Sequence, residues 1–593
     1  MSPSPSQSQS PTSGPSQTSS PSLSSHPSPS PSLSSASGVG TKSRALRWLP
    51  RLLAVFGCGV GAFAYQAWPS GEDGAVGSAA KPPYLTLFLI DGCAHEVFDA
   101  ELAAGRLPNI QRMMDEGLFV ENGVSAFPSM TAYGYYGFLT GQDAVFGGPL
   151  GLRWYDRERG KGPFRSYVGK TNTLFNHDMA PGRQTIFEAF PDQHSLSINT
   201  YANRGAHRSE KTGWMFTMAK YKDHWWVAGL LSSLPMVRDR VAPDWPEIES
   251  RVVDLAIKDL AHRPKVQWVT FVSPDTYGHV YGLGPRYPEL LRHIDTLIGR
   301  YREASRAAGL EADRVYAVVS DHGVETVSRN VDLTKNLAAA GLPAFRGEAT
   351  MLWSDAIDDP PSALDPYKAL VVINGNLMNY LYFQDPTGEG WRTRPNYETL
   401  RAYPAARGPV DLVRTLVETD GIEFAILRGP RGGVEVHAAD GVGFVTTSSA
   451  GYAYRFEGQD PLRMPPASQS LTDGRPHAAS RWLRDTREAE YPYAVVRLAR
   501  LFAQEGAGDI VVTSAPGVDL AEDFELFVDN YRGGHGGLRR AQMVVPYVLS
   551  GPGIAAGRRV AAATPEDVGA TLWHLLGGRP LENVLGHRLE GGE

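Results

Sequence analysis

Three apolar runs of strand length, each followed at once by an acidic turn, constrain this 593-residue chain most. They span residues 84–90, 267–272 and 315–320. Nearly continuous apolar runs of this length are typical of parallel strands that are covered on both faces. A fourth run, 509–513, has the same character and is expected to be a further strand of the same sheet.

Helical patterns separate these runs, at residues 245–260, 288–307 and 493–504. The resulting order, strand then helix then strand, predicts an α/β fold whose mostly parallel sheet carries helices on both faces. Ligands of such open sheets bind beyond the carboxyl ends of the strands. Polar residues at those ends are therefore candidates for a functional site.

The candidates at these positions are three acids and three histidines: Asp91, Asp275, His279, Asp321, His322 and His535. An acid after one strand is usually a turn or a helix cap, so it is the agreement between several strand ends that indicates a functional site. Asp275 and His279 are four residues apart, which places both on one side of a helical turn. Three buried carboxylates repel one another unless cations neutralise them. The residues therefore predict two metal sites with nitrogen and oxygen ligands.

Composition excludes several other classes of site. The only cysteines are Cys58 and Cys93, which rules out a disulfide scaffold and a zinc site built on thiolates. The formal charge of −7 comes from 57 basic and 64 acidic residues without a block of like charges. This distribution argues against a nucleic-acid-binding surface.

Thr131 is the candidate nucleophile. It lies between an expected strand at 119–126 and an expected helix at 132–141, so its hydroxyl is placed at or near the first helical turn. Backbone N–H groups there favour an anion. The alternative is that Thr131 or Ser129 simply caps the helix. The chain has no Gly-x-Ser-x-Gly, Walker A or His-Glu-x-x-His motif, so activation of a hydroxyl would fall to a bound metal.

In this order the residues resemble the alkaline phosphatase superfamily, most closely its type I phosphodiesterase/nucleotide pyrophosphatase branch. The resemblance covers about residues 84–345 and 490–580. The matching elements are Asp91, Phe127-Pro128-Ser129-Met130-Thr131, Asp275-x-x-x-His279, Asp321-His322-Gly323 and Gly534-His535-Gly536. The resemblance implies an alkaline-phosphatase-like α/β fold and an enzyme that hydrolyses phosphoric ester or pyrophosphate bonds.

The resemblance also implies the role of each residue. Asp275, His279 and His535 would hold one metal ion. The other ion would be held by Asp91, Asp321 and His322, with Thr131 bound to it as the nucleophile that forms a phosphothreonine intermediate. Zinc is the expected metal, because half of the ligands other than Thr131 are imidazoles.

Two positions depart from the family pattern. The branch commonly has Asn where Gly134 stands, and again near its Tyr-Asp pair, where Leu152 stands. These departures concern the substrate more than the metals. A small phosphoric diester or a pyrophosphate is the expected substrate. A phosphomonoesterase, a transferase of phosphorylated head groups and a metal-stabilised binding protein without turnover remain open as alternatives.

The chain is expected to divide into six segments. These are a disordered Ser/Pro-rich tail (1–41), a basic flank with a hydrophobic segment (42–68), a linker (69–81), the first segment of the catalytic core (82–345), an inserted α+β cap (346–491) and the second segment of the catalytic core (492–593). The apolar stretch within 42–68 is slightly shorter than the ~20 residues that span a membrane comfortably. It is expected to be an uncleaved membrane anchor, with a cleaved signal peptide as the alternative. Either would place the enzyme outside the cytoplasm, in the periplasm or at the cell surface.

Overall fold

The computed structural model describes residues 82–146, 148–157, 164–167, 174–212, 245–346, 364–521, 531–578 and 586–589. All of them belong to one compact unit, Ala67–Glu593. The predicted tail (1–41), hydrophobic segment (42–68) and linker (69–81) lie outside the described residues. Within the described ranges, no helix is both long and apolar enough to cross a membrane. The division into core and cap segments stays a prediction, as does the location outside the cytoplasm.

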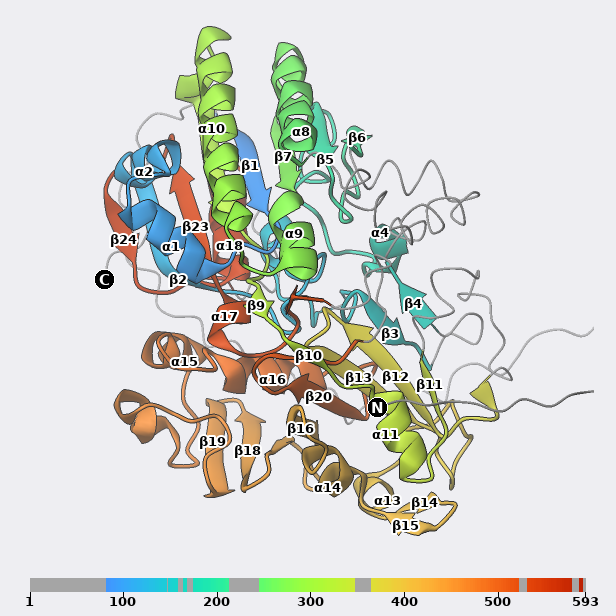
Figure 1. Cartoon of the computed structure of the whole chain (residues 1–593). Coiled ribbons are helices and arrows are strands. Elements are labelled where there is room, and N and C mark those ends of the chain that lie inside the picture. Colours follow the sequence, from blue (N-terminus) through green and yellow to red (C-terminus); the bar gives the residue numbers. More distant parts are fainter. Residues whose placement is uncertain are drawn as a thin grey trace, which may run out of the picture. The chain divides into compact units, whose positions relative to one another are not determined.

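An eight-stranded sheet forms the centre of the unit, in the order β24-β2-β23-β8-β1-β7-β5-β6 (Figure 1). Its strands are β1 Tyr84–Ile90, β2 Gly117–Val124, β5 Ser195–Ile198, β6 Arg208–Glu210, β7 Val266–Phe271, β8 Arg314–Val319, β23 Val544–Ser550 and β24 Arg558–Val560. The strands from β8 to β6 are parallel to one another. Strand β23 runs antiparallel to both of its neighbours. The predicted α/β fold with a mostly parallel sheet is confirmed.

Both faces of this sheet are buried, which explains the continuous apolar runs. Side chains alternate along β1, so Leu85, Leu87 and Leu89 enter one core while Phe88 and Ile90 enter another. One core is closed by α3 Tyr135–Thr140 and α18 Pro565–Leu575. The other is closed by α1 His95–Ala103, α2 Pro108–Asp115, α8 Trp245–Asp259 and α10 Arg286–Ala307.

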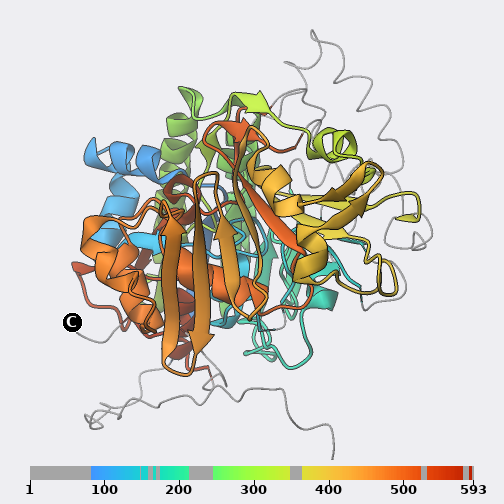
Figure 2. The same ribbon diagram turned by 90° about the horizontal axis from the view of Figure 1, so that it is seen from below.

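A second eight-stranded sheet has the order β11-β12-β13-β20-β16-β17-β18-β19 (Figure 2). Its strands are β11 Ala344–Arg346, β12 Ala369–Asn374, β13 Met378–Phe383, β16 Ile422–Arg428, β17 Val434–His437, β18 Gly441–Ser448, β19 Gly451–Gly458 and β20 Ile510–Ser514. One face shares a core with the central sheet. Its helices are α11 Leu333–Ala339, α13 Tyr397–Arg401, α14 Leu412–Val417, α15 Ala479–Thr486 and α16 Ala494–Phe502.

The expectation that residues 509–513 add a strand to the central sheet is wrong. These residues form most of β20, which pairs antiparallel with β13 and β16 in the second sheet. Val511 faces the core shared with the central sheet, and Ile510 and Val512 face the core on the other side. Burial on both faces produces an apolar run in either sheet, so the run cannot identify the sheet to which it belongs.

The expected helix at 132–141 is shorter than predicted. Ala132 has a φ of 67°, and residues 131–134 form a turn before α3 begins at Tyr135. Within the turn, the Gly134 N–H donates to the Met130 carbonyl at 2.8 Å and the Tyr133 N–H donates to the Thr131 carbonyl at 2.8 Å. Thr131 therefore lies in a tight turn ahead of the helix and not in its first turn.

Candidate metal centre

The six candidate ligands come from elements that end near one another. Asp91 directly follows β1, and Asp321 and His322 follow β8. Asp275 and His279 lie one turn apart on α9 Ser273–Tyr281, which begins just after β7. His535 follows β22 Gly533–Gly534, which pairs with β9 Glu325–Thr326 beyond the end of β8. Chain segments far apart in sequence are thereby gathered at one edge of the central sheet.

The first group consists of Asp275, His279 and His535, whose ligand atoms all lie within 4.8 Å of one another. Asp275 Oδ1 is 3.3 Å from His279 Nε2 and 3.5 Å from His535 Nε2. The two Nε2 atoms are 3.1 Å apart. Two imidazole nitrogens and a carboxylate oxygen converging in this way suit the coordination of a single cation.

The second group surrounds His322. The ligand atoms of Asp91, Asp275 and His322 lie within 4.8 Å of one another. His322 Nε2 is 3.4 Å from Asp91 Oδ1 and 3.5 Å from Asp321 Oδ2. The Thr131 hydroxyl completes this group, at 3.1 Å from His322 Nε2 and 3.3 Å from Asp91 Oδ1. Asp275 lies between the two groups, so the structure brings Thr131 and all six predicted ligands together.

The tautomers of the three histidines are set by the backbone. The Nδ1 atoms lie near carbonyl oxygens: that of Gly533 at 3.0 Å for His279, that of Gly323 at 3.1 Å for His322 and that of Ser129 at 2.9 Å for His535. A carbonyl only accepts, so each Nδ1 carries the proton and donates it. The Nε2 lone pairs are then directed to the centre, as in histidines that ligate metals.

The carboxylates are placed where they cannot all be ionised without cations. Burial, together with the charges of Asp321 and Asp275, holds the pKa of Asp91 well above its usual range. Burial and Asp275 also raise the pKa of Asp321. Within the described stretches of the chain, Asp275 Oδ1 and Asp321 Oδ2 are buried and accept no hydrogen bond. Unsatisfied anionic oxygens of this kind fit a centre that holds divalent ions.

Two of the three imidazoles, those of His322 and His535, are suited to act as neutral ligands. At His279 burial is outweighed by the neighbouring Asp275, which raises the pKa of the imidazole. Burial lowers the pKa of His322 to about 3. It also holds the pKa of His535 well below its usual range, helped by His322 and opposed by Asp275. Uncharged Nε2 atoms are therefore available around neutral pH, which is the protonation state that binds a metal.

Gly134, a departure from the family pattern, has a steric reason. A Cβ atom at position 134 would lie 2.7 Å from the Asp321 carbonyl oxygen and 2.8 Å from the Asp321 Cβ. Real Cβ atoms do not approach neighbours so closely. The turn that carries Thr131 therefore packs directly on the backbone of Asp321, a candidate ligand. An Asn at position 134 would displace either this turn or the Asp321 backbone.

We predict that Gly134→Ala weakens metal binding at the group around His322, because the new methyl displaces Asp321. Changes to residues that support ligands typically cost about 10–100-fold in metal affinity. Competition with a chromophoric chelator measures this affinity. Gly284→Ala is the matched control, since a Cβ there meets only ordinary contacts at 3.7 Å and beyond. Wild-type affinity in Gly134→Ala would contradict the packing argument.

Leu152 is the second departure from the family pattern. It has no side-chain amide, and its segment holds a loop in place. Its side chain is buried, and its backbone N–H lies 2.9 Å from Met130 Sδ. The next residue, Arg153, donates its backbone N–H to Asn374 Oδ1 at 3.0 Å. The segment is thus tied both to the residue before Thr131 and to the end of β12.

Two tyrosines near the centre are not among the predicted site residues. Tyr135 donates its hydroxyl to Asp91 Oδ2 at 3.2 Å. Burial and the charges of Asp91 and Asp275 raise the pKa of Tyr201. Tyr135 follows Thr131 by four residues, which is a usable signal, but Tyr201 lies in a loop that no local pattern connects to the centre.

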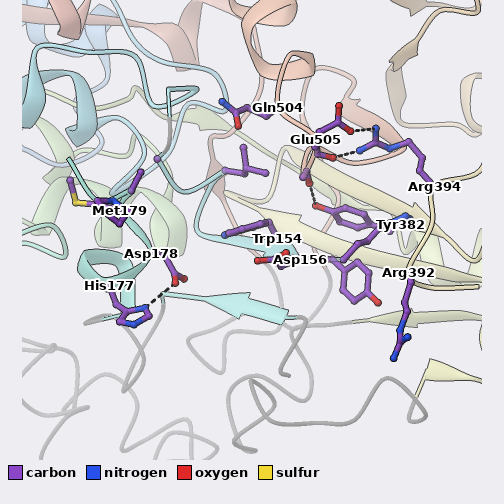
Figure 3. Close-up of a pocket in the computed structure, with 17 residues that line it drawn as sticks. Trp154, Asp156, His177, Asp178, Met179, Tyr382, Arg392, Arg394, Gln504 and Glu505 are labelled. Carbon is purple, nitrogen blue, oxygen red and sulfur yellow. Dashed lines mark hydrogen bonds and ion pairs between the residues drawn. The ribbon is translucent and has the colours of Figure 1, made fainter. Parts of the chain in front are cut away.

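A cavity of about 540 Å³ lies between the segment that follows α3 and the second sheet (Figure 3). It is lined by residues 148, 150, 154–157, 177–181, 382, 392, 394 and 504–506. His177 Nδ1 lies 3.3 Å from Asp178 Oδ1, and Arg394 donates to Glu505 at 3.1 Å. Residues of the predicted core and of the predicted cap therefore share one cavity.

The fold agrees with a sequence match that identifies a hydrolase acting on phosphoester bonds, of the alkaline phosphatase superfamily. The family model for type I phosphodiesterase/nucleotide pyrophosphatase matches residues 85–385, just over half of the chain. The protein belongs to this family, whose members depend on metal ions. The predicted family and the predicted class of enzyme are confirmed.

Several solved structures are similar to this chain. Murine ectonucleotide pyrophosphatase/phosphodiesterase 5 is 13% identical with a TM-score of 0.46, over 85% of this chain and 97% of that one. The human protein of the same name is 12% identical with a TM-score of 0.47, over 85% and 96%. An inactive variant of the murine protein in complex with AMP is 13% identical with a TM-score of 0.45, over 85% and 97%. No curated protein matches the sequence.

Proposed function

We propose that this protein hydrolyses small phosphoric diesters or pyrophosphates with Thr131 as its nucleophile. The observation that carries the proposal is the position of the Thr131 hydroxyl, 3.1 Å from His322 Nε2 and 3.3 Å from Asp91 Oδ1. The family match supports the same reaction class. A hydroxyl that only caps a helix would not be expected to lie beside a carboxylate and an imidazole that follow two other strands.

In this proposal two divalent ions occupy the centre. Asp275, His279 and His535 would hold one ion, and Asp91, Asp321 and His322 would hold the other together with Thr131. Three imidazoles among six ligands favour zinc over magnesium or calcium. When bound, the ions lower the pKa of a ligating hydroxyl and neutralise charge on the phosphoryl group.

The chain itself supplies the position of the attacking oxygen. The hydrogen bonds of the 131–134 turn and the close packing of Gly134 on Asp321 fix the Thr131 hydroxyl beside the ligands. In the reaction Thr131 Oγ1 bonds to phosphorus, the bond to the leaving oxygen breaks, and water then hydrolyses the phosphothreonine. Such reactions are accelerated chiefly by positioning and by electrostatic stabilisation.

A diester is preferred over a monoester because of the charge around Thr131. Within the described ranges, no Lys or Arg makes an ion pair or a hydrogen bond with Thr131 or with the acidic ligands Asp91, Asp275 and Asp321. A monoester dianion would bring an extra negative charge to these acids, and no Lys or Arg of the described ranges that contacts them would offset it. A diester, with one negative charge, avoids this cost.

The test compares two substrates on the purified full-length chain. We expect kcat/KM for bis-p-nitrophenyl phosphate to exceed that for p-nitrophenyl phosphate by at least about 10-fold, which is a difference of ~1.4 kcal/mol in the barrier. Protein stripped with a chelator serves as the blank. A clear preference for the monoester would replace this proposal with a phosphomonoesterase on the same core.

A further inference from the structure

A second cluster of ligand side chains lies apart from the proposed catalytic centre. His194, Asp259 and His262 each offer an atom within 4.8 Å of the others. His194 immediately precedes β5, Asp259 ends α8, and His262 ends the short helix η2 Leu260–His262 ahead of β7. The cluster is therefore at the amino ends of β5 and β7, whereas five of the six proposed catalytic ligands follow the carboxyl ends of β1, β7 and β8 (Figure 1).

Both imidazoles are directed at one carboxylate oxygen. His194 Nε2 lies 2.9 Å from Asp259 Oδ1, and His262 Nδ1 lies 3.4 Å from the same atom. The other oxygen, Oδ2, accepts a hydrogen bond from Gln267 Nε2 at 3.1 Å. Gln267 thereby holds the carboxylate with Oδ1 facing the histidines.

The cluster combines a buried anion with imidazoles that solvent reaches. The Asp259 side chain is 0% exposed, whereas those of His194 and His262 are 28% and 61% exposed. An ion from solvent can therefore reach a carboxylate that is itself shielded from water. The nearby His207 is occupied elsewhere, because its two ring nitrogens lie 3.1 Å from Ser195 Oγ and 2.9 Å from the Pro191 carbonyl.

Arg208 is the cationic side chain that could compete with a metal ion for Asp259, and it pairs with another carboxylate. Arg208 Nη1 lies 3.7 Å from Asp259 Oδ1, beyond hydrogen-bonding distance. Its Nη2 pairs with Glu210 at 2.8 Å. Arg208 therefore pairs more closely with Glu210 than with Asp259.

We propose that His194, Asp259 and His262 form a separate site for a divalent transition-metal ion, of which zinc is the best fit. Two neutral imidazole nitrogens and one carboxylate oxygen, with water in the remaining position, are a typical set of zinc ligands. The bound ion ties the turn after α8 to the segment before β5 and so braces the amino edge of the central sheet. This site does not depend on the reaction proposed for Thr131.

The test counts ions on the full-length chain. Wild-type protein and variants are stripped with a chelator, reloaded with ZnCl₂ and desalted, and zinc per chain is measured by inductively coupled plasma mass spectrometry. We expect His262→Ala and His194→Gln each to carry about one ion fewer than the wild type, with hydrolysis of bis-p-nitrophenyl phosphate unchanged. His207→Ala, which changes the neighbouring imidazole, is expected to keep the wild-type count.

Two further readouts locate the ion and control for folding. Anomalous scattering at the zinc edge is expected to give a peak among His194, Asp259 and His262. Thermal unfolding shows whether each variant folds, and added zinc is expected to raise the melting temperature of the wild type more than that of His262→Ala. An unchanged zinc count in both variants, or the lack of an anomalous peak here in zinc-loaded crystals, would overturn the proposal.

Discussion

Thr131→Ala is expected to lower kcat by roughly 10⁴-fold or more, the scale of loss seen when a nucleophile is removed. The substitution deletes the only atom that would bond to phosphorus and leaves the six other ligands in place. Metal content is therefore expected to stay at the wild-type level. Steady-state hydrolysis of bis-p-nitrophenyl phosphate and elemental analysis of the same sample give both quantities.

The matched control for this substitution is Thr140→Ala, which removes a hydroxyl from the same segment. Thr140 Oγ1 donates to the Tyr136 carbonyl at 2.7 Å and is not among the groups around His322. Its loss is expected to change kcat by less than about 10-fold, because it touches no reacting group. Wild-type turnover in Thr131→Ala would refute Thr131 as the nucleophile, whereas loss of the metals in that variant would leave the role of its hydroxyl to be tested by Thr131→Ser.

Arg497→Met is expected to destabilise the protein by about 3–5 kcal/mol, because it leaves buried carboxylates without their cationic partner. Arg497 lies on α16, and its side chain is only 2% exposed. Its Nη1 pairs with Asp143 at 3.0 Å and with Glu566 at 2.6 Å, and its Nε donates to the Ser125 carbonyl at 3.0 Å. Loss of the cation leaves Glu566 without its buried partner and Asp143 with Arg500 alone. Urea denaturation monitored by circular dichroism measures the change.

The pH dependence of this effect has a definite sign. Burial raises the pKa of Glu566, but Arg497 beside it more than reverses the effect and lowers the pKa to about 2. A lowered pKa contributes stability that is present above the ordinary value of 4.5 and is lost as the pH falls towards about 2. The difference between wild type and Arg497→Met is therefore expected to be largest near neutral pH and to shrink below pH 4.5.

A surface arginine provides the comparison. Arg414 pairs with Glu418 at 2.7 Å along α14, and their side chains are 73% and 61% exposed. Arg414→Met is expected to change the free energy of unfolding far less than Arg497→Met does, because exposed ion pairs contribute little to stability. If both substitutions cost the same, the buried network around Arg497 is not an important source of stability.

Much of the fold and of the candidate centre could be predicted because the relevant signals are local. A strand buried on both faces needs a continuous apolar run, as at β1, β7 and β8, and the polar residue after each run is adjacent in sequence. Asp91, Asp275 and Asp321 could be found in this way, and His279 follows Asp275 by one helical turn. The order of these residues also indicated the family that the match over residues 85–385 shows.

The features that could not be predicted depend on contacts between distant segments. Ile510–Ser514 belongs to the second sheet because of its pairing with β13 and β16, and an apolar run carries no information about its partner. The reason for glycine at position 134 is the backbone of Asp321, and the reason that Tyr201 matters is its approach to Asp91 and Asp275. None of these distances follows from spacing along the chain.

By itself the sequence determined which segments are buried strands, which side chains stand at their ends and which family they represent. Only the tertiary structure decided how those ends meet, which tautomer each histidine adopts, and that His194, Asp259 and His262 form a second cluster at the opposite edge. The physical reason is that burial and helical periodicity act over a few residues, whereas ligand convergence is set by how the sheets and helices pack.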